Sequence, residues 1–176
     1  MKAQIWVETV IYTLIAFVMI GLVLSFIRPK IEQVRDEAII EETIRLMEDL
    51  DNIILSVRDV TGNQRLIDMN IKKGVLNIDG IKNQVDFKME SAFTYSQPGE
   101  DVLYGDIVVR TMKKTGDLNV ITLVSNYSKD YDIQYKEENK LMSLTQSPTP
   151  YRTSVSNKGI NASKIIIAII TSRNLL

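Results

Sequence analysis

The chain carries no charged residue between positions 9 and 27, and this apolar run limits its fold most strongly. As a helix, residues 5–27 would be about 34 Å long at roughly 1.5 Å per residue, longer than a hydrocarbon core of about 30 Å. Glu8 is the only charge in residues 4–27. We therefore predict a membrane-spanning helix over residues 4–27.

A cleaved secretory signal is the alternative for the same segment. Its apolar region would be about 7–15 residues long and would precede a small-residue cleavage site. Here the run is longer, and Arg28-Pro29-Lys30 stands where that site would lie. We therefore expect the helix to be retained.

Composition excludes several functions. The chain has 176 residues, no Cys and no His, which removes thiol nucleophiles, imidazole bases and the usual zinc ligands. Its net charge is −1, and it lacks the basic stripe that nucleic-acid binding needs. We predict no cofactor, no metal site, no catalytic residue and no nucleic-acid partner.

Residues 28–60 have the pattern of an amphipathic helix. Pro29 removes one backbone donor and is expected to bend the helix without ending it. We therefore predict one helix over residues 4–60, about 85 Å long, with Gly62 in the left-handed position after its end. Its apolar stripe comprises Ile39, Leu46, Leu50, Ile53, Val57 and Val60, with Ile40, Ile44, Met47 and Ile54 beside it.

Residues 61–176 change to a period of two, which predicts strands. Short strands at this spacing predict a sandwich or a barrel, so the expected fold class is α+β. A turn is expected at Asn157-Lys158-Gly159. The expected strands lie near residues 67–71, 76–78, 85–89, 102–112, 118–127, 131–135, 141–145, 151–156 and 163–171.

The last of these strands is apolar without alternation, from Ile165 to Ile170. Such a strand is expected to be covered on both faces. We predict that one face packs inside the sheet domain and that the other meets the helix stripe. Ile166 and Ile167 would then both be buried.

The beginning of the chain resembles the class III signal of type IV pilins and of their archaeal pilin and archaellin relatives. The resemblance rests on Lys2-Ala3, on Gln4-Ile5-Trp6-Val7-Glu8 and on the apolar helix that follows. It implies a leader of residues 1–3, cut by a prepilin peptidase between Ala3 and Gln4. Glu8 would become the fifth mature residue. Read alone, Glu8 is also explained as an interfacial carboxylate that reaches the headgroups.

The resemblance also implies a function and partners. The chain would be a structural subunit of an extracellular filament, anchored in membrane lipid before an assembly platform adds it to copies of itself. The new amine of Gln4 would pair with Glu8 of a neighbour. The sheet domain would lie outside the cell, where the sequons at Asn126 and Asn161 are glycosylation candidates.

Three other functions remain open at this stage. The chain would be a single-pass membrane protein that displays a binding domain without polymerising, or a minor pilin or pseudopilin. A membrane-tethered hydrolase would use carboxylates near Asp130, Asp132, Glu137 and Glu138, for which solvated loop charges are the simpler explanation. Six tyrosines would form a glycan-binding face or pack between strands: Tyr95, Tyr104, Tyr127, Tyr131, Tyr135 and Tyr151.

Overall fold

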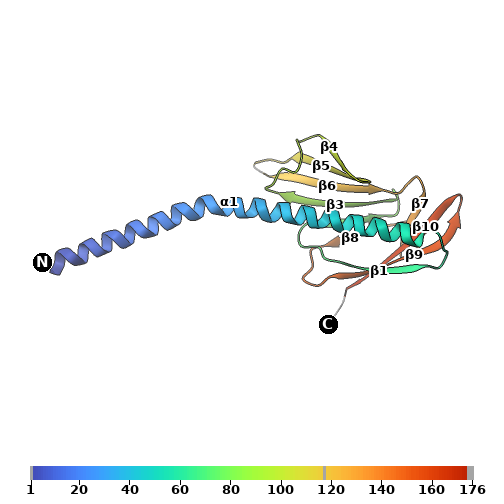
Figure 1. Ribbon diagram of the computed structural model, residues 1–176, viewed down its shortest axis with the longest axis horizontal. Coiled ribbons are helices and arrows are strands. Elements are labelled where there is room, and N and C mark those ends of the chain that lie inside the picture. The colour runs from blue at the N-terminus through green and yellow to red at the C-terminus, as the bar shows by residue number, and fades with distance from the viewer. Residues whose placement is uncertain (1, 117, 174–176) are drawn as a thin grey trace.

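A computed structural model describes residues 2–116 and 118–173, and it consists of one long helix followed by ten strands (Figure 1). The fold class is α+β, as predicted. Helix α1 covers Lys2–Val57. The strands are β1 Gln64–Met69, β2 Val75–Asp79, β3 Gln84–Ser91, β4 Asp101–Tyr104, β5 Ile107–Lys113, β6 Asn119–Asn126, β7 Tyr131–Tyr135, β8 Leu141–Thr145, β9 Tyr151–Asn161 and β10 Lys164–Arg173.

Helix α1 is continuous through Pro29, as predicted, and its 56 residues span about 84 Å. Figure 1 shows that its axis bends between the half that projects and the half that lies on the sheets. The helix ends at Val57, earlier than predicted, and Asn157 of β9 donates to the carbonyl oxygens of Val57 and of the next residue, Arg58. Gly62 has a φ of 85°, but it lies in the turn that leads into β1 and not directly after the helix.

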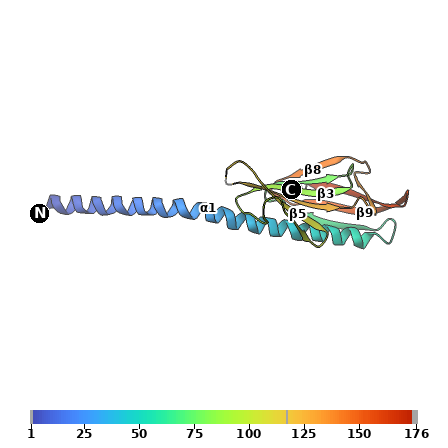
Figure 2. The same ribbon diagram turned by 90° about the horizontal axis from the view of Figure 1, so that it is seen from above.

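The strands form two sheets. The six-stranded sheet is antiparallel, in the order β4-β5-β6-β3-β2-β8. The four-stranded sheet has the order β1-β9-β10-β7, with β10 parallel to β7. The second half of α1 lies against β9 and β1 of one sheet and against β3 and β5 of the other. Figures 1 and 2 show this half of the helix along one side of both sheets, while the first half projects beyond them. We use the term head for the two sheets together with the helical segment that they cover.

Alternation along the strands builds the core. In β3, Val85, Phe87 and Met89 are buried while the residues between them are more exposed. From the helix, Ile40 and Ile54 are fully buried in the same apolar cluster. The head is therefore held together by one core shared between the helix and both sheets.

Two turns differ from the predicted ones. The expected strand over residues 102–112 is two strands, because Gly105, with a φ of 59°, lets the chain reverse between Tyr104 and Ile107. Strand β9 runs through the turn expected at residues 157–159, where the pairing with β10 contains a bulge instead. The reversal comes at Ala162 and Ser163, whose φ angles of 47° and 75° suit a two-residue hairpin.

Strand β10 is covered on both faces at its centre, as predicted for so apolar a segment. Ile167, Ala168 and Ile169 have no exposed surface, whereas Ile166 is only partly buried. The prediction that this strand fastens the helix was wrong, because the helix contacts β9 and β1 much more than β10. Strand β10 lies between β9 and β7 and forms the centre of its own sheet.

Candidate functional site: the projecting helix and its attachment

The described side chains in the first half of α1, from Trp6 onward, are exposed and not covered by the head. Every large apolar side chain from Trp6 to Ile27 is between 44% and 75% exposed. Exposure extends beyond the predicted boundary at residue 27, since Ile31 and Val34 are also exposed. The first buried side chain described along the helix is that of Asp36.

This half of the helix is long and apolar enough to cross a membrane. The most apolar 18-residue window of the helix has a mean hydropathy of 2.7, and none of that window is buried. The hydroxyls of Thr13 and Ser25 donate to the carbonyl groups of Val10 and Leu22, at 2.9 and 2.7 Å. These bonds satisfy both hydroxyls within the helix, as a lipid environment requires.

Glu8 lies on this exposed helix, and among the side chains that the structure describes it has no hydrogen-bond or ion-pair partner. Ala3 and Gln4 belong to the first turns of α1, and their side chains lie outside the described part. The predictions of cleavage after Ala3 and of a pair between Glu8 and a neighbouring amine therefore stay predictions.

Two buried polar side chains join the helix to the head, and the first is Asp36. Its buried carboxylate accepts hydrogen bonds from Lys73 Nζ at 2.5 Å and from the backbone N–H of Ala92 at 2.8 Å. Lys73 follows β1 and Ala92 follows β3, so one side chain joins the helix to segments next to both sheets. The sequence interpretation missed this role, because Asp36 looks like any residue of the charged face.

The second attachment point is Asn157 of β9. Its Nδ2 donates to the carbonyl oxygens of Val57 at 3.1 Å and of Arg58 at 2.7 Å. Its backbone carbonyl accepts from Gly62 at 2.8 Å, and its backbone N–H donates to the carbonyl oxygen of Asn63 at 3.0 Å. These bonds satisfy helix-end carbonyls that would otherwise lack donors. The β-bulge gives Asn157 this position, and the sequence pattern alone indicated only a turn.

A groove of about 1020 Å³ runs from the end of α1 over the six-stranded sheet. Ser125 and Tyr127 are among the residues that line it, and their buried hydroxyl oxygens have no hydrogen-bond partner in the described residues. Burial raises the pKa of Asp51 in the same groove; the nearby Tyr127 hydroxyl opposes the rise and the charge of Asp106 adds to it. Burial and the Asp51 charge likewise raise the pKa of Tyr127.

The other candidate residues fall into three groups. Asn126 and Asn161 are exposed at the ends of β6 and β9, and Asn126 Oδ1 accepts from the backbone N–H of Ser128 at 2.9 Å. Glu137 and Glu138 form ion pairs with Lys158 and Lys140. Among the described residues, no group of three or more acidic side chains is placed to hold a metal ion. Four tyrosines are buried and pack the core: Tyr127, Tyr131, Tyr135 and Tyr151.

Comparison with known protein families, with curated proteins and with solved structures found no match for this chain.

Proposed function

We propose that this chain is the structural subunit of a type IV pilin-like filament, with residues 6–27 of α1 in the membrane before assembly and in the filament core afterwards. One observation carries the proposal: an exposed apolar helix that continues without a break into the core of a folded head. The N-terminal resemblance at Ala3, Gln4 and Glu8 adds the processing step.

The exposed apolar side chains of this helix must be shielded from water. Burying one large apolar side chain stabilises a protein by about 1.5–3 kcal/mol, so this surface is strongly unfavourable in water. Acyl chains cover it in a bilayer, and apolar helices of other copies cover it in a bundle. Because one helix surface suits both surroundings, a subunit is able to leave the membrane and enter a filament.

Glu8 gives the assembly its register in this proposal. A charge at the bilayer centre costs about 2.5–3.5 kcal/mol on insertion scales, and less near the interface. Cleavage after Ala3 would create a positive amine at Gln4 that Glu8 of a neighbour is able to pair with. Such a buried pair adds little net stability, but an unpaired charge is costly, so misaligned helices are disfavoured.

The test compares the wild type with Glu8→Gln in cells that supply the assembly proteins. We expect the wild type to begin at Gln4 by intact-mass measurement and to form filaments visible by electron microscopy. Glu8→Gln is expected to enter the membrane normally and to give few filaments. A Glu32→Gln variant, which changes an exposed charge outside the apolar run, is the control.

Three results would each contradict a part of this proposal. Wild-type protein that remains in the membrane without forming filaments would identify a single-pass protein that displays its head. Normal filament yield from Glu8→Gln would leave Glu8 as an interfacial carboxylate. Retention of Met1 in assembled filaments would exclude the processing step.

A further inference from the structure

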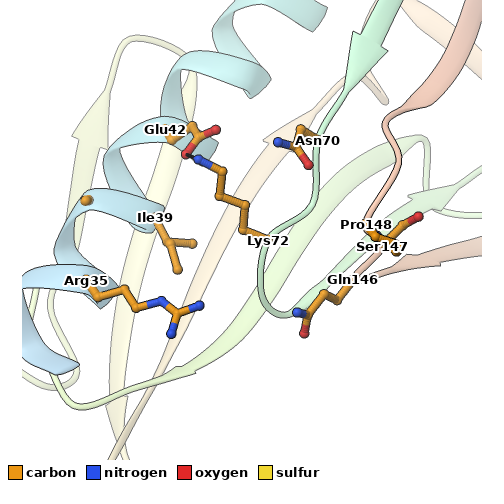
Figure 3. Close-up of a pocket in the computed structure, with 9 residues that line it drawn as sticks. Arg35, Ile39, Glu42, Asn70, Lys72, Gln146, Ser147 and Pro148 are labelled. Atoms are coloured by element: carbon orange, nitrogen blue, oxygen red, sulfur yellow. Dashed lines mark ion pairs between the residues drawn. The ribbon is translucent and has the colours of Figure 1, made fainter.

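An open cavity of about 690 Å³, lined by both polar and apolar residues, lies beside α1 where the helix enters the head. Figure 3 shows its walls: the helix on one side, and on the other the segments that follow β1 and β8. Arg35 comes from the helix, Asn70 and Lys72 follow β1, and Gln146 follows β8.

Three exposed polar side chains of this cavity lack partners among the residues that the structure describes. Arg35, Asn70 and Gln146 make no side-chain hydrogen bond or ion pair with any residue that the structure describes. In Figure 3, Arg35 and Gln146 extend toward one another from opposite walls. The acidic residue of the cavity, Glu42, is already paired with Lys72 at 2.8 Å. The cavity therefore offers one uncompensated positive charge and two amide groups.

The position of the cavity along the helix places it near a membrane surface. Arg28 is the first charge after the apolar run, and Arg35 follows seven residues later, about 10 Å along the axis. The interfacial layer on each side of a hydrocarbon core is about 5–8 Å thick. Helical side chains lean toward the N-terminus, so the long Arg35 side chain leans toward this layer.

An apolar track leads from the cavity toward the membrane-spanning segment. Ile27, Ile31, Arg35 and Ile39 are spaced by four residues, so they lie along one ridge of the helix. Ile27 is 44% exposed and Ile31 is 60% exposed, while Arg35 and Ile39 line the cavity. A molecule with an anionic head and an apolar tail fits this order of polar and apolar groups.

We propose that this cavity binds the phosphate of a phospholipid headgroup, with Arg35 as its main ligand and the acyl chains along Ile31 and Ile27. The inference rests on the membrane anchorage in the proposed function. Guanidinium groups bind phosphate oxygens through two parallel hydrogen bonds, which an amine does not reproduce. The amides of Asn70 and Gln146 supply further donors. Free phosphate shares the head chemistry but lacks the tail that the track accommodates.

The experiment uses the full chain in nanodiscs made of equal parts phosphatidylcholine and phosphatidylglycerol. Vesicle flotation first establishes that each variant is in the bilayer. Native mass spectrometry then measures the phospholipid that remains bound after release into non-ionic detergent. We expect the wild type to retain phospholipid, preferably phosphatidylglycerol, and Arg35→Gln to retain about tenfold less, the effect of losing one charged hydrogen-bonding partner.

Arg45→Gln is the matched control, because it removes the same charge from the same helix. Arg45 is highly exposed, pairs with Glu41 at 3.5 Å and does not line the cavity. We expect this variant to retain as much lipid as the wild type, and Arg35→Lys to retain an intermediate amount. Equal losses in Arg35→Gln and Arg45→Gln would overturn the site, because they would indicate a general charge effect.

Other outcomes separate the competing explanations. Failure of the wild type to float with vesicles would reject the membrane anchorage itself. Flotation without retained phospholipid would reject only the lipid site. Inorganic phosphate that displaces phosphatidylglycerol at similar concentrations would overturn the lipid assignment in favour of a phosphate site. If Arg35→Gln retains lipid normally but forms no filaments, the cavity would be a binding site for a neighbouring subunit. That result would overturn the inference.

Discussion

The carboxylate of Asp36 lies 2.5 Å from the ammonium group of Lys73, at the point where the helix passes from an exposed to a buried environment. The Asp36 side chain is only 5% exposed, whereas that of Lys73 is 40% exposed. The carboxylate also accepts from the N–H of Ala92. The pair therefore fixes the depth to which the helix enters the head.

Removing Asp36 is expected to destabilise the head. Asp36→Ala would leave the Ala92 N–H without its partner, at a cost of about 1–3 kcal/mol. Asp36→Asn keeps an acceptor for Ala92 and is expected to cost less. Urea unfolding in non-ionic detergent, followed by near-ultraviolet circular dichroism, measures both. Glu41→Gln, which breaks an exposed ion pair with Arg45, is expected to change stability by less than about 1 kcal/mol.

Asn157→Ala is expected to loosen the end of α1. The substitution removes two donors to helix carbonyls and an acceptor for the N–H of Gly159. We expect a loss of about 1–3 kcal/mol and faster amide hydrogen exchange in the last helical turn. The exposed Asn161 provides the control as Asn161→Ala. Unchanged exchange in the last turn of Asn157→Ala would show that packing alone holds the helix end.

Asp51→Asn is expected to stabilise the protein at neutral pH. Because the folded-state pKa of Asp51 is raised above its ordinary value, ionisation of this group opposes folding. The penalty is absent at acidic pH, where the group is protonated in both states, and it is complete above the folded pKa. The gain from Asp51→Asn should therefore appear at neutral pH and vanish near about pH 3. Asp49→Asn, on the exposed face, is the control; an equal gain there would assign the effect to net charge.

Ile167→Ala is expected to cost about 2–5 kcal/mol, because the side chain is fully buried. Ile166→Ala should cost clearly less, since Ile166 is only partly buried and lies where the pairing with β9 is irregular. Ile170 is 39% exposed, so Ile170→Ala adds a third degree of burial to this comparison of Ile→Ala variants. Equal melting temperatures for Ile166→Ala and Ile167→Ala would show that a further surface covers Ile166.

The spacing of apolar residues predicted the helix and most of the strands. It did not predict which side chains bond to residues far away in the chain. The apolar run, the continuous helix and the alternation at Val85, Phe87 and Met89 were all predicted, because each depends on residues close in sequence. The turn at Gly105 was missed because apolar strands flank it closely on both sides. The sequence did not single out Asp36, and it assigned Asn157 only to a turn, because their partners are far away in the chain. Ala92 is 56 residues from Asp36, and Val57 is 100 residues from Asn157.

That separation of 100 residues has a consequence during synthesis. The ribosome completes α1 long before it reaches β9, and at about 5–20 residues per second the delay is roughly 5–20 s. Throughout that interval the inward stripe of the helix, including Ile40, Leu50 and Ile54, has no β9 to cover it. We therefore expect slower translation between Val57 and Asn157 to increase loss of the nascent chain to aggregation, unless a chaperone or the membrane surface shields the stripe.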